Sequence, residues 1–239
     1  MKLSFSLQRS TAGVLLALLL LVPFFSSAQQ VFGQKKEEES EKPVRKIADP
    51  KDHIVVDFSY DGYLHLPDGI QQKPYSLGGN AYLMWDYPLG YTPLSFAIGG
   101  GFSTHDVHTN GRITYSIDGK YTSFVPITIK FKTNKFSCNY FEVPVELRLR
   151  QKGNKGFKLA IGGKIGYAYN THVKYEDADG KMKVYRIKNV DPLRYGVTLR
   201  IGFDKWNVQG FYAFSELFRK GRGEPGMSQF SVGIGLLLY

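Results

Sequence analysis

The sequence predicts an all-β protein, an eight-stranded antiparallel up-and-down transmembrane β-barrel. Apolar residues alternate with polar ones in segments of about ten residues from Ile54 to the end of the chain. The connections between these segments are alternately short and long, as in outer-membrane barrels. Beyond the first 28 residues, no apolar run reaches the roughly 18 residues that would indicate a membrane-spanning helix.

Residues 1–28 are predicted to be a signal peptide. Lys2 and Arg9 precede an apolar run over residues 12–25, and small residues end at Ala28. The run of about 14 residues is shorter than the roughly 20 that a membrane anchor needs, so cleavage after Ala28 and export are expected. The single cysteine, Cys138, excludes an internal disulfide framework.

Residues 29–52 are polar and charged, and they lack the apolar side chains that would offset ordering entropy. We interpret them as a disordered periplasmic lead-in, and we assign residues 53–239 to the barrel. The formal net charge is +10. In an exported chain this charge favours anionic lipid headgroups as partners, and nucleic acid is not expected.

Eight segments carry the alternation. The clearest runs from Phe141 to Leu149, where apolar residues occupy every odd position and Glu142, Glu146 and Arg148 lie between them. Residues 157–170 and 193–203 repeat it, and weaker versions begin at Ile54, Leu77, Leu94, Trp206 and Phe230. Helical geometry would scatter these residues, whereas strands gather them on one face.

The connections predict the topology. Residues 86–93, 151–156 and 204–205 are the short turns, and residues 67–76, 105–139, 172–191 and 217–228 are the long loops. Short turns then share the periplasmic rim with both termini. We expect the loop segments Ile113–Ser116 and Phe124–Phe131 to extend the sheet above the membrane.

The two-residue turn at Asp204 and Lys205 sets a hairpin register. It predicts pairing of Phe203 with Trp206 and, further along, of Val197 with Tyr212 and Tyr195 with Phe214.

The apolar faces are rich in aromatic residues near strand ends, and the charged faces are rich in glycine. This combination predicts apolar side chains toward lipid and charged side chains in the lumen. Eight strands enclose only enough room for side chains, so no open pore is expected. Buried charges need partners. We therefore predict a structural network of lumen ion pairs, with a binding or proton site as the alternative, among Glu142, Glu146, Arg148, Lys164, Arg194 and Arg200.

The motif from Ser103 to His108 contains Ser103, His105, Asp106 and His108. These residue types can form a hydrolase triad or a metal site, but neighbours on a strand point to opposite faces, and the spacing matches no known ligand set. We prefer to interpret this motif as polar residues at the start of a loop.

Two further loop motifs have simple interpretations. Asp177, Asp179 and Gly180 resemble the start of a calcium loop without its remaining ligands, so a turn is favoured. The basic segment Arg219–Arg222 is interpreted as a solvated loop, with contact to lipopolysaccharide phosphates as the alternative. No catalytic residue, cofactor or metal site is expected.

The stretches Tyr140–Arg150, Gly156–Tyr167 and Ile187–Gly202 resemble the PorT-like outer-membrane β-barrel family. The resemblance extends over Ile54 to Tyr239 and implies an eight-stranded barrel in the bacterial outer membrane. The namesake of that family assists a protein-secretion system, and the family supplies no catalytic motif. Tyr239 departs from the expected pattern, because it is out of phase with the apolar stripe of the last strand.

The sequence therefore predicts an integral outer-membrane barrel with a structural, secretion-accessory or surface-binding role and no enzymatic activity. The alternatives are a lipid-modifying hydrolase of the outer membrane and a soluble periplasmic ligand-binding barrel. The expected partners are outer-membrane lipids and lipopolysaccharide, with secretion-system or other envelope proteins as further candidates.

Overall fold

The computed structural model describes residues 54–150 and 156–238 of the chain. The predicted signal peptide, residues 1–28, and the predicted lead-in, residues 29–52, lie outside the described residues. Within the two described ranges, no helix is long and apolar enough to cross a membrane.

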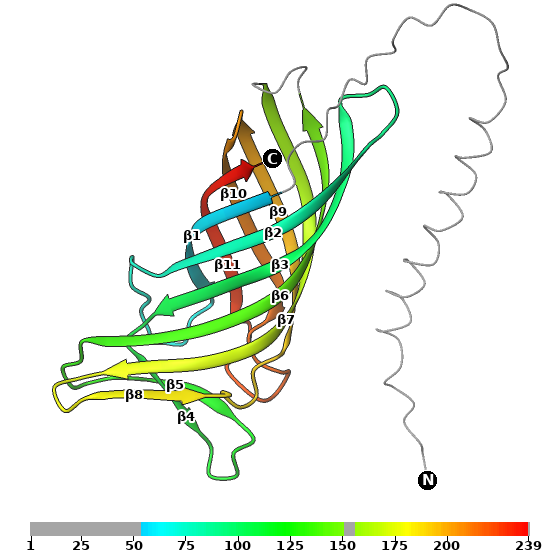
Figure 1. Ribbon diagram of the computed structural model, residues 1–239. Helices are drawn as coiled ribbons and strands as arrows, with labels where there is room; N and C mark the ends of the chain where they lie inside the picture. The colour runs from blue at the N-terminus through cyan, green and yellow to red at the C-terminus, as the bar shows by residue number, and fades with distance from the viewer. Residues whose placement is uncertain (1–53, 151–155, 239) are drawn as a thin grey trace, which may run out of the picture. The chain divides into compact units, whose positions relative to one another are not determined.

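A closed ring of eight strands forms the described part of the chain (Figure 1). Every neighbouring pair is antiparallel, and the pairing of the last ring strand with the first closes the barrel. The all-β, up-and-down, eight-stranded prediction is confirmed. In ring order the strands are β1 (Ile54–Leu64), β2 (Leu77–Pro88), β3 (Leu94–His108), β6 (Thr133–Arg150), β7 (Phe157–Glu176), β9 (Leu193–Phe203), β10 (Trp206–Glu216) and β11 (Ser228–Leu238).

Three short strands belong to the long loops: β4 (Gly111–Tyr115), β5 (Thr122–Pro126) and β8 (Lys181–Tyr185). β4 and β5 form a separate two-stranded sheet, so the expectation that this loop extends the barrel sheet is wrong. The reason is packing, because Phe124 of β5 turns inward onto Phe136 and Phe218. β8 extends the barrel sheet instead, by pairing with residues 172–176 at the end of β7.

Several strands are longer than the sequence pattern indicates. β3 continues to His108 and β7 to Glu176, into segments that were expected to be loops. β2 continues to Pro88, so Asp86 is part of a strand and is buried rather than lying in a turn. In all three cases, backbone pairing with a neighbouring strand continues where the apolar alternation fades.

The hairpin of β9 and β10 has the predicted register. Phe203 lies opposite Trp206, and the pairing continues to Val197 opposite Tyr212. The ladder ends at Gly196 and Ala213, one pair before the expected pairing of Tyr195 with Phe214. The backbone N–H of Tyr195 instead donates to the Ser215 hydroxyl at 3.2 Å, an example of a side chain competing with the strand ladder.

Candidate functional site

The two faces of the barrel wall differ sharply in exposure. On β6 the odd-numbered Phe141, Val143 and Leu147 are 42–49% exposed, whereas Glu142 and Glu146 are 2% and 4% exposed. The apolar residues therefore point outward and the charged residues point into the lumen. A belt of exposed apolar side chains surrounding a barrel is unfavourable in water and suits a hydrocarbon environment.

Glu142 is the centre of the first lumen cluster. Its Oε1 accepts a hydrogen bond from Arg194 Nη2 at 2.5 Å, and its Oε2 accepts one from Lys164 Nζ at 2.9 Å. The Tyr82 hydroxyl also donates to Oε2. These four side chains come from β6, β9, β7 and β2, so the cluster ties together strands from several parts of the ring.

Arg194 has further partners within the lumen. Its Nη1 donates to Gln229 at 2.7 Å, its Nη2 donates to Ser103 at 2.8 Å, and its guanidinium lies 3.6 Å from the centre of the Tyr140 ring. Because a buried cation needs both charge compensation and hydrogen-bond acceptors, these contacts stabilise Arg194 in the barrel interior.

The second lumen cluster is a chain of ion pairs centred on Glu146. Arg148 Nε lies 2.8 Å from Glu146 Oε2, and Arg200 Nε lies 3.7 Å from Oε1. Arg200 continues to Asp57 in one direction, and Arg148 continues to Asp86 at 3.2 Å in the other. Arg150 also donates to Asp86.

The six residues predicted from the sequence are all buried in the lumen, and each belongs to one of these two clusters. Sequence reasoning missed three carboxylates, Asp57, Asp61 and Asp86, and one cation, Arg150. With them, the buried charges of the described residues number five acidic and five basic side chains. The alternation of Val56, Phe58 and Tyr60 already placed Asp57 and Asp61 on the inner face, whereas Asp86 was assigned to a turn.

Two glycines leave room for this network. A Cβ on Gly162 would lie 2.1 Å from the Val145 carbonyl oxygen, next to Glu146. A Cβ on Gly235 would lie 2.2 Å from Asp57 Oδ1 and 2.8 Å from Arg200 Nη1. At Gly235 the charged side chains occupy the space that a larger residue would take, whereas at Gly162 the backbone of the neighbouring strand occupies it.

An apolar cap closes the lumen at the end of the barrel away from Ile54 and Leu238. All four long loops contribute to it, and the strand residues Tyr63, Val107, Phe136, Cys138 and Tyr140 lie beneath it. The loop backbones are also hydrogen-bonded to one another, from Thr122 N–H to Arg222 O and from Asp191 N–H to Leu217 O. The loop side chains of the cap are Ile70, Phe124, Ile187, Val190, Leu217, Phe218 and Met227.

Outward aromatic side chains lie near both ends of the wall, with Trp85, Phe203 and Trp206 at the end of the short turns and a cluster of three rings near the cap. The Phe102 and Phe141 rings lie 4.8 Å apart, and the Phe141 and Tyr169 rings lie 4.6 Å apart. Such rings are characteristic of the girdles at the boundary between lipid and water.

The family model for the outer membrane protein beta-barrel domain matches residues 54–228. The chain belongs to the outer membrane protein beta-barrel domain family. Membership agrees with the outward apolar belt and the charged lumen, and it indicates an outer-membrane location. The comparison with curated proteins finds no match.

Ser103 and His105 lie inside this outer-membrane barrel, each 1% exposed. The Ser103 hydroxyl accepts the hydrogen bond from Arg194, while His105 Nδ1 lies 3.2 Å from Asp61. Asp106 points to the other face and pairs with Lys135 at 2.5 Å. The motif therefore does not converge into a triad, and no group of three or more potential metal ligands is found among the described residues.

The two loop motifs form turns on the same outer-membrane barrel. Asp177 Oδ1 accepts hydrogen bonds from the backbone N–H groups of Asp179 at 2.9 Å and Gly180 at 3.1 Å, which makes a turn between β7 and β8. In the basic segment, the N–H of Arg222 donates to Arg219 O. Both Arg219 and Arg222 anchor the cap through their backbones.

Proposed function

We propose that this barrel is a closed, non-conducting protein of the bacterial outer membrane with a structural or secretion-accessory role, which it performs by presenting its cap to other envelope components. The observation that supports the proposal is that the interior of the barrel is blocked in two ways. Ion-paired side chains fill the lumen, and the apolar loop cluster covers its outer mouth.

The energetics favour a static barrel over a gated one. Removing one partner from a buried ion pair costs about 3–5 kcal/mol, because the other charge is left uncompensated. Opening a continuous path would separate several such pairs in a space that excludes most water. A transport role would require that cost at every opening event.

Exposed apolar residues on the cap support a protein-contact role. Ile117 at the turn between β4 and β5 is fully exposed, and Ile129, beyond the other end of this hairpin, is 63% exposed. Apolar side chains that project into water on an ordered surface commonly mark protein interfaces. The resemblance to the PorT-like family supports a secretion system as the source of such a partner.

The proposal includes no enzymatic step. Ser103, the nucleophile of the alternative hydrolase hypothesis, is buried and hydrogen-bonded to a cation. The outward apolar belt likewise gives no support to a soluble ligand-binding barrel.

Two measurements test the proposed function. Planar-bilayer recordings of the full chain should show no stable conductance steps under conditions where a porin does, and stable steps would overturn the closed barrel.

Chemical crosslinking in the native host should capture an envelope protein with the parent chain. Ile117→Asp should reduce that capture strongly, whereas the control Tyr91→Asp, on the opposite rim and 67% exposed in the parent, should leave it unchanged. Equal capture by both variants would exclude the cap as the contact surface.

A further inference from the structure

Basic side chains form a line across four strands at the outer end of the barrel. Lys135 of β6 lies opposite Lys174 of β7, and Lys174 lies opposite Lys183 of β8. On the other side, Lys135 lies opposite His108 of β3. We call Lys135, Lys174 and Lys183 the lysine row. Because directly opposite residues share a face of the sheet, the three ammonium groups project from the same side.

That side is the outer wall of the barrel. Phe136 is 2% exposed, and Val173 packs against the apolar cap, so both point inward. Since side chains alternate along a strand, their neighbours Lys135 and Lys174 point outward. Phe141 is six residues from Lys135 on the same face of β6 and belongs to the aromatic girdle.

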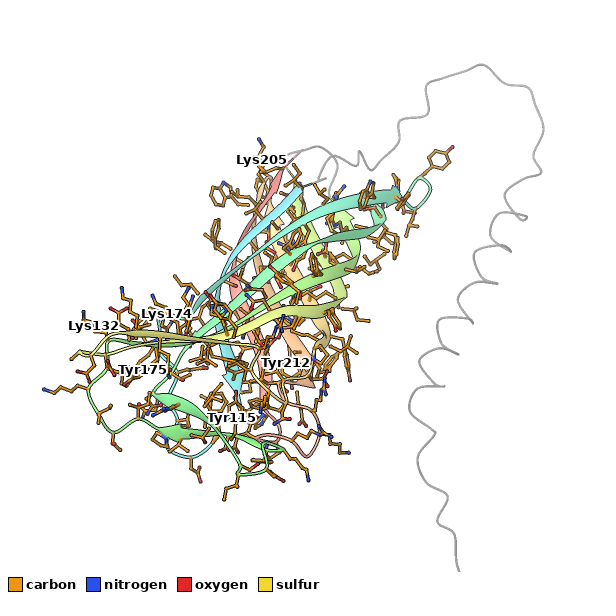
Figure 2. The ribbon with its side chains drawn as sticks, turned by 60° about the horizontal axis from the view of Figure 1, so that its bottom comes forward. Tyr115, Lys132, Lys174, Tyr175, Lys205 and Tyr212 are labelled. Carbon is orange, nitrogen blue, oxygen red and sulfur yellow. The ribbon has the colours of Figure 1, made fainter. Side chains whose placement is uncertain are left out.

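The spacing places the lysine row beyond the hydrocarbon region. Six strand residues rise about 20 Å, which corresponds to about 14 Å along the membrane normal for a strand tilted by about 45°. Figure 2 shows Lys174 at the outer end of the barrel, with Lys205 at the opposite end. Long lysine side chains can bend back toward the membrane surface from this height. The row therefore lies at the level of lipid headgroups.

The protein compensates these charges incompletely. Asp106 pairs with Lys135 at 2.5 Å. Glu176 lies 3.8 Å from Lys132 and 3.5 Å from Lys181. Neither Lys174 nor Lys183 forms an ion pair with another described residue. Like charges directly opposite each other on a sheet are destabilising, so an external anion would relieve this repulsion.

We infer that the lysine row binds the phosphate groups of outer-leaflet lipids. The inference rests on the proposed membrane position of the barrel and adds a defined lipid site on one side of its wall. Phosphate is the matching ligand because it is the concentrated anion at headgroup level and because ammonium groups bind it as point charges. Each lysine near an anionic lipid surface contributes about fivefold to binding.

The test is a titration of the full chain in detergent with diphosphorylated lipid A, with bound lipid counted by native mass spectrometry. The double variant Lys174→Gln and Lys183→Gln should bind about 30-fold more weakly than the parent. The matched control, Lys120→Gln and Lys220→Gln, removes the same charge from two other outer loops and should bind as the parent does. Dephosphorylated lipid A should bind the parent and the row variant equally.

Equal affinity of the row variant and the parent would overturn the inference, as would undiminished binding of dephosphorylated lipid. An equal loss in both double variants would also overturn it, since it would show a diffuse charge effect. Heat-dependent gel mobility of each variant verifies that the barrel is folded. A negative result leaves the closed-barrel proposal intact, because the bilayer recordings decide that question independently.

Discussion

Asp57 and Arg200 form a two-point ion pair inside the barrel, with Arg200 Nη1 2.6 Å from Asp57 Oδ1 and Nη2 3.0 Å from Oδ2. Asp57 is in β1 and Arg200 is in β9, and two strands, β10 and β11, separate them around the ring. Backbone hydrogen bonds do not join these two strands, so this side-chain contact links them through the lumen. Its removal is a direct test of the network.

Asp57→Asn should lower the free energy of unfolding by about 3–5 kcal/mol, because Arg200 loses its carboxylate partner in a buried site. The midpoint of urea unfolding of the detergent-folded barrel, read from gel mobility, measures the change. Asp204→Asn, in the two-residue turn between β9 and β10 and outside the lumen network, is the control and should leave the midpoint unchanged. The double variant with Arg200→Gln should recover part of the loss. An unchanged midpoint for Asp57→Asn would contradict the ion-pair network.

Gly235→Ala should destabilise the barrel by about 1–3 kcal/mol, because the added methyl group would displace Asp57 or Arg200. Gly210→Ala is a matched control in the neighbouring strand, since a Cβ there has no atom within 4 Å. Thermal loss of the folded gel band compares the two. If both substitutions destabilised the barrel equally, the loss of stability would come from replacing any strand glycine and not from crowding in the lumen.

Phe218→Ala should loosen the cap, because it removes a buried ring that contacts Phe124 across two loops. The expected cost is about 3–5 kcal/mol, confined to the loops if cap and barrel unfold separately. Limited proteolysis should then cut the loops at least tenfold faster while the ring of strands stays protected. Phe214→Ala, at an outward position that is 59% exposed, is the control and should not change loop cleavage. Unchanged loop cleavage in Phe218→Ala would contradict a packed cap.

The topology predicts which rim faces the outside of the cell. Cysteine introduced at Asp179 or Ser116 should react with an impermeant maleimide on whole cells, whereas cysteine at Lys205 should react only after lysis. The native Cys138 is fully buried, so it adds little background labelling. Labelling at Lys205 in intact cells, without labelling at Asp179, would reverse the assignment.

The alternation of residues was sufficient to predict the eight ring strands and their faces, but not where β2, β3 and β7 end. Phe141 and Glu142 differ in exposure as that pattern requires, and the register at Asp204 and Lys205 follows from the turn length. These features are local, since each depends on a period of two and on a short connection.

The cap and part of the lumen network could not be predicted in the same way. Phe124 and Phe218 are 94 positions apart in the sequence, and no local pattern indicates that their rings meet. Asp86 was assigned to a turn because Pro88 and Gly90 follow it closely, although β2 continues through it. Charge balance could have indicated the missing carboxylates. The six predicted lumen residues comprise four cations and only two carboxylates, so further acidic residues were needed to neutralise them.

Closure of the ring has a consequence for biogenesis. β1 pairs with β11 along its full length, from Ile54 opposite Leu238 to Leu64 opposite Ser228. One edge of β1 therefore has no partner until β11 pairs with it. Until then Asp57 also lacks Arg200, and an unpaired edge and an unpaired charge would both be exposed to lipid. A stepwise insertion of single strands would be unfavourable at every stage. Insertion of the ring as a nearly complete sheet would avoid exposing either the unpaired edge or the unpaired charge to lipid.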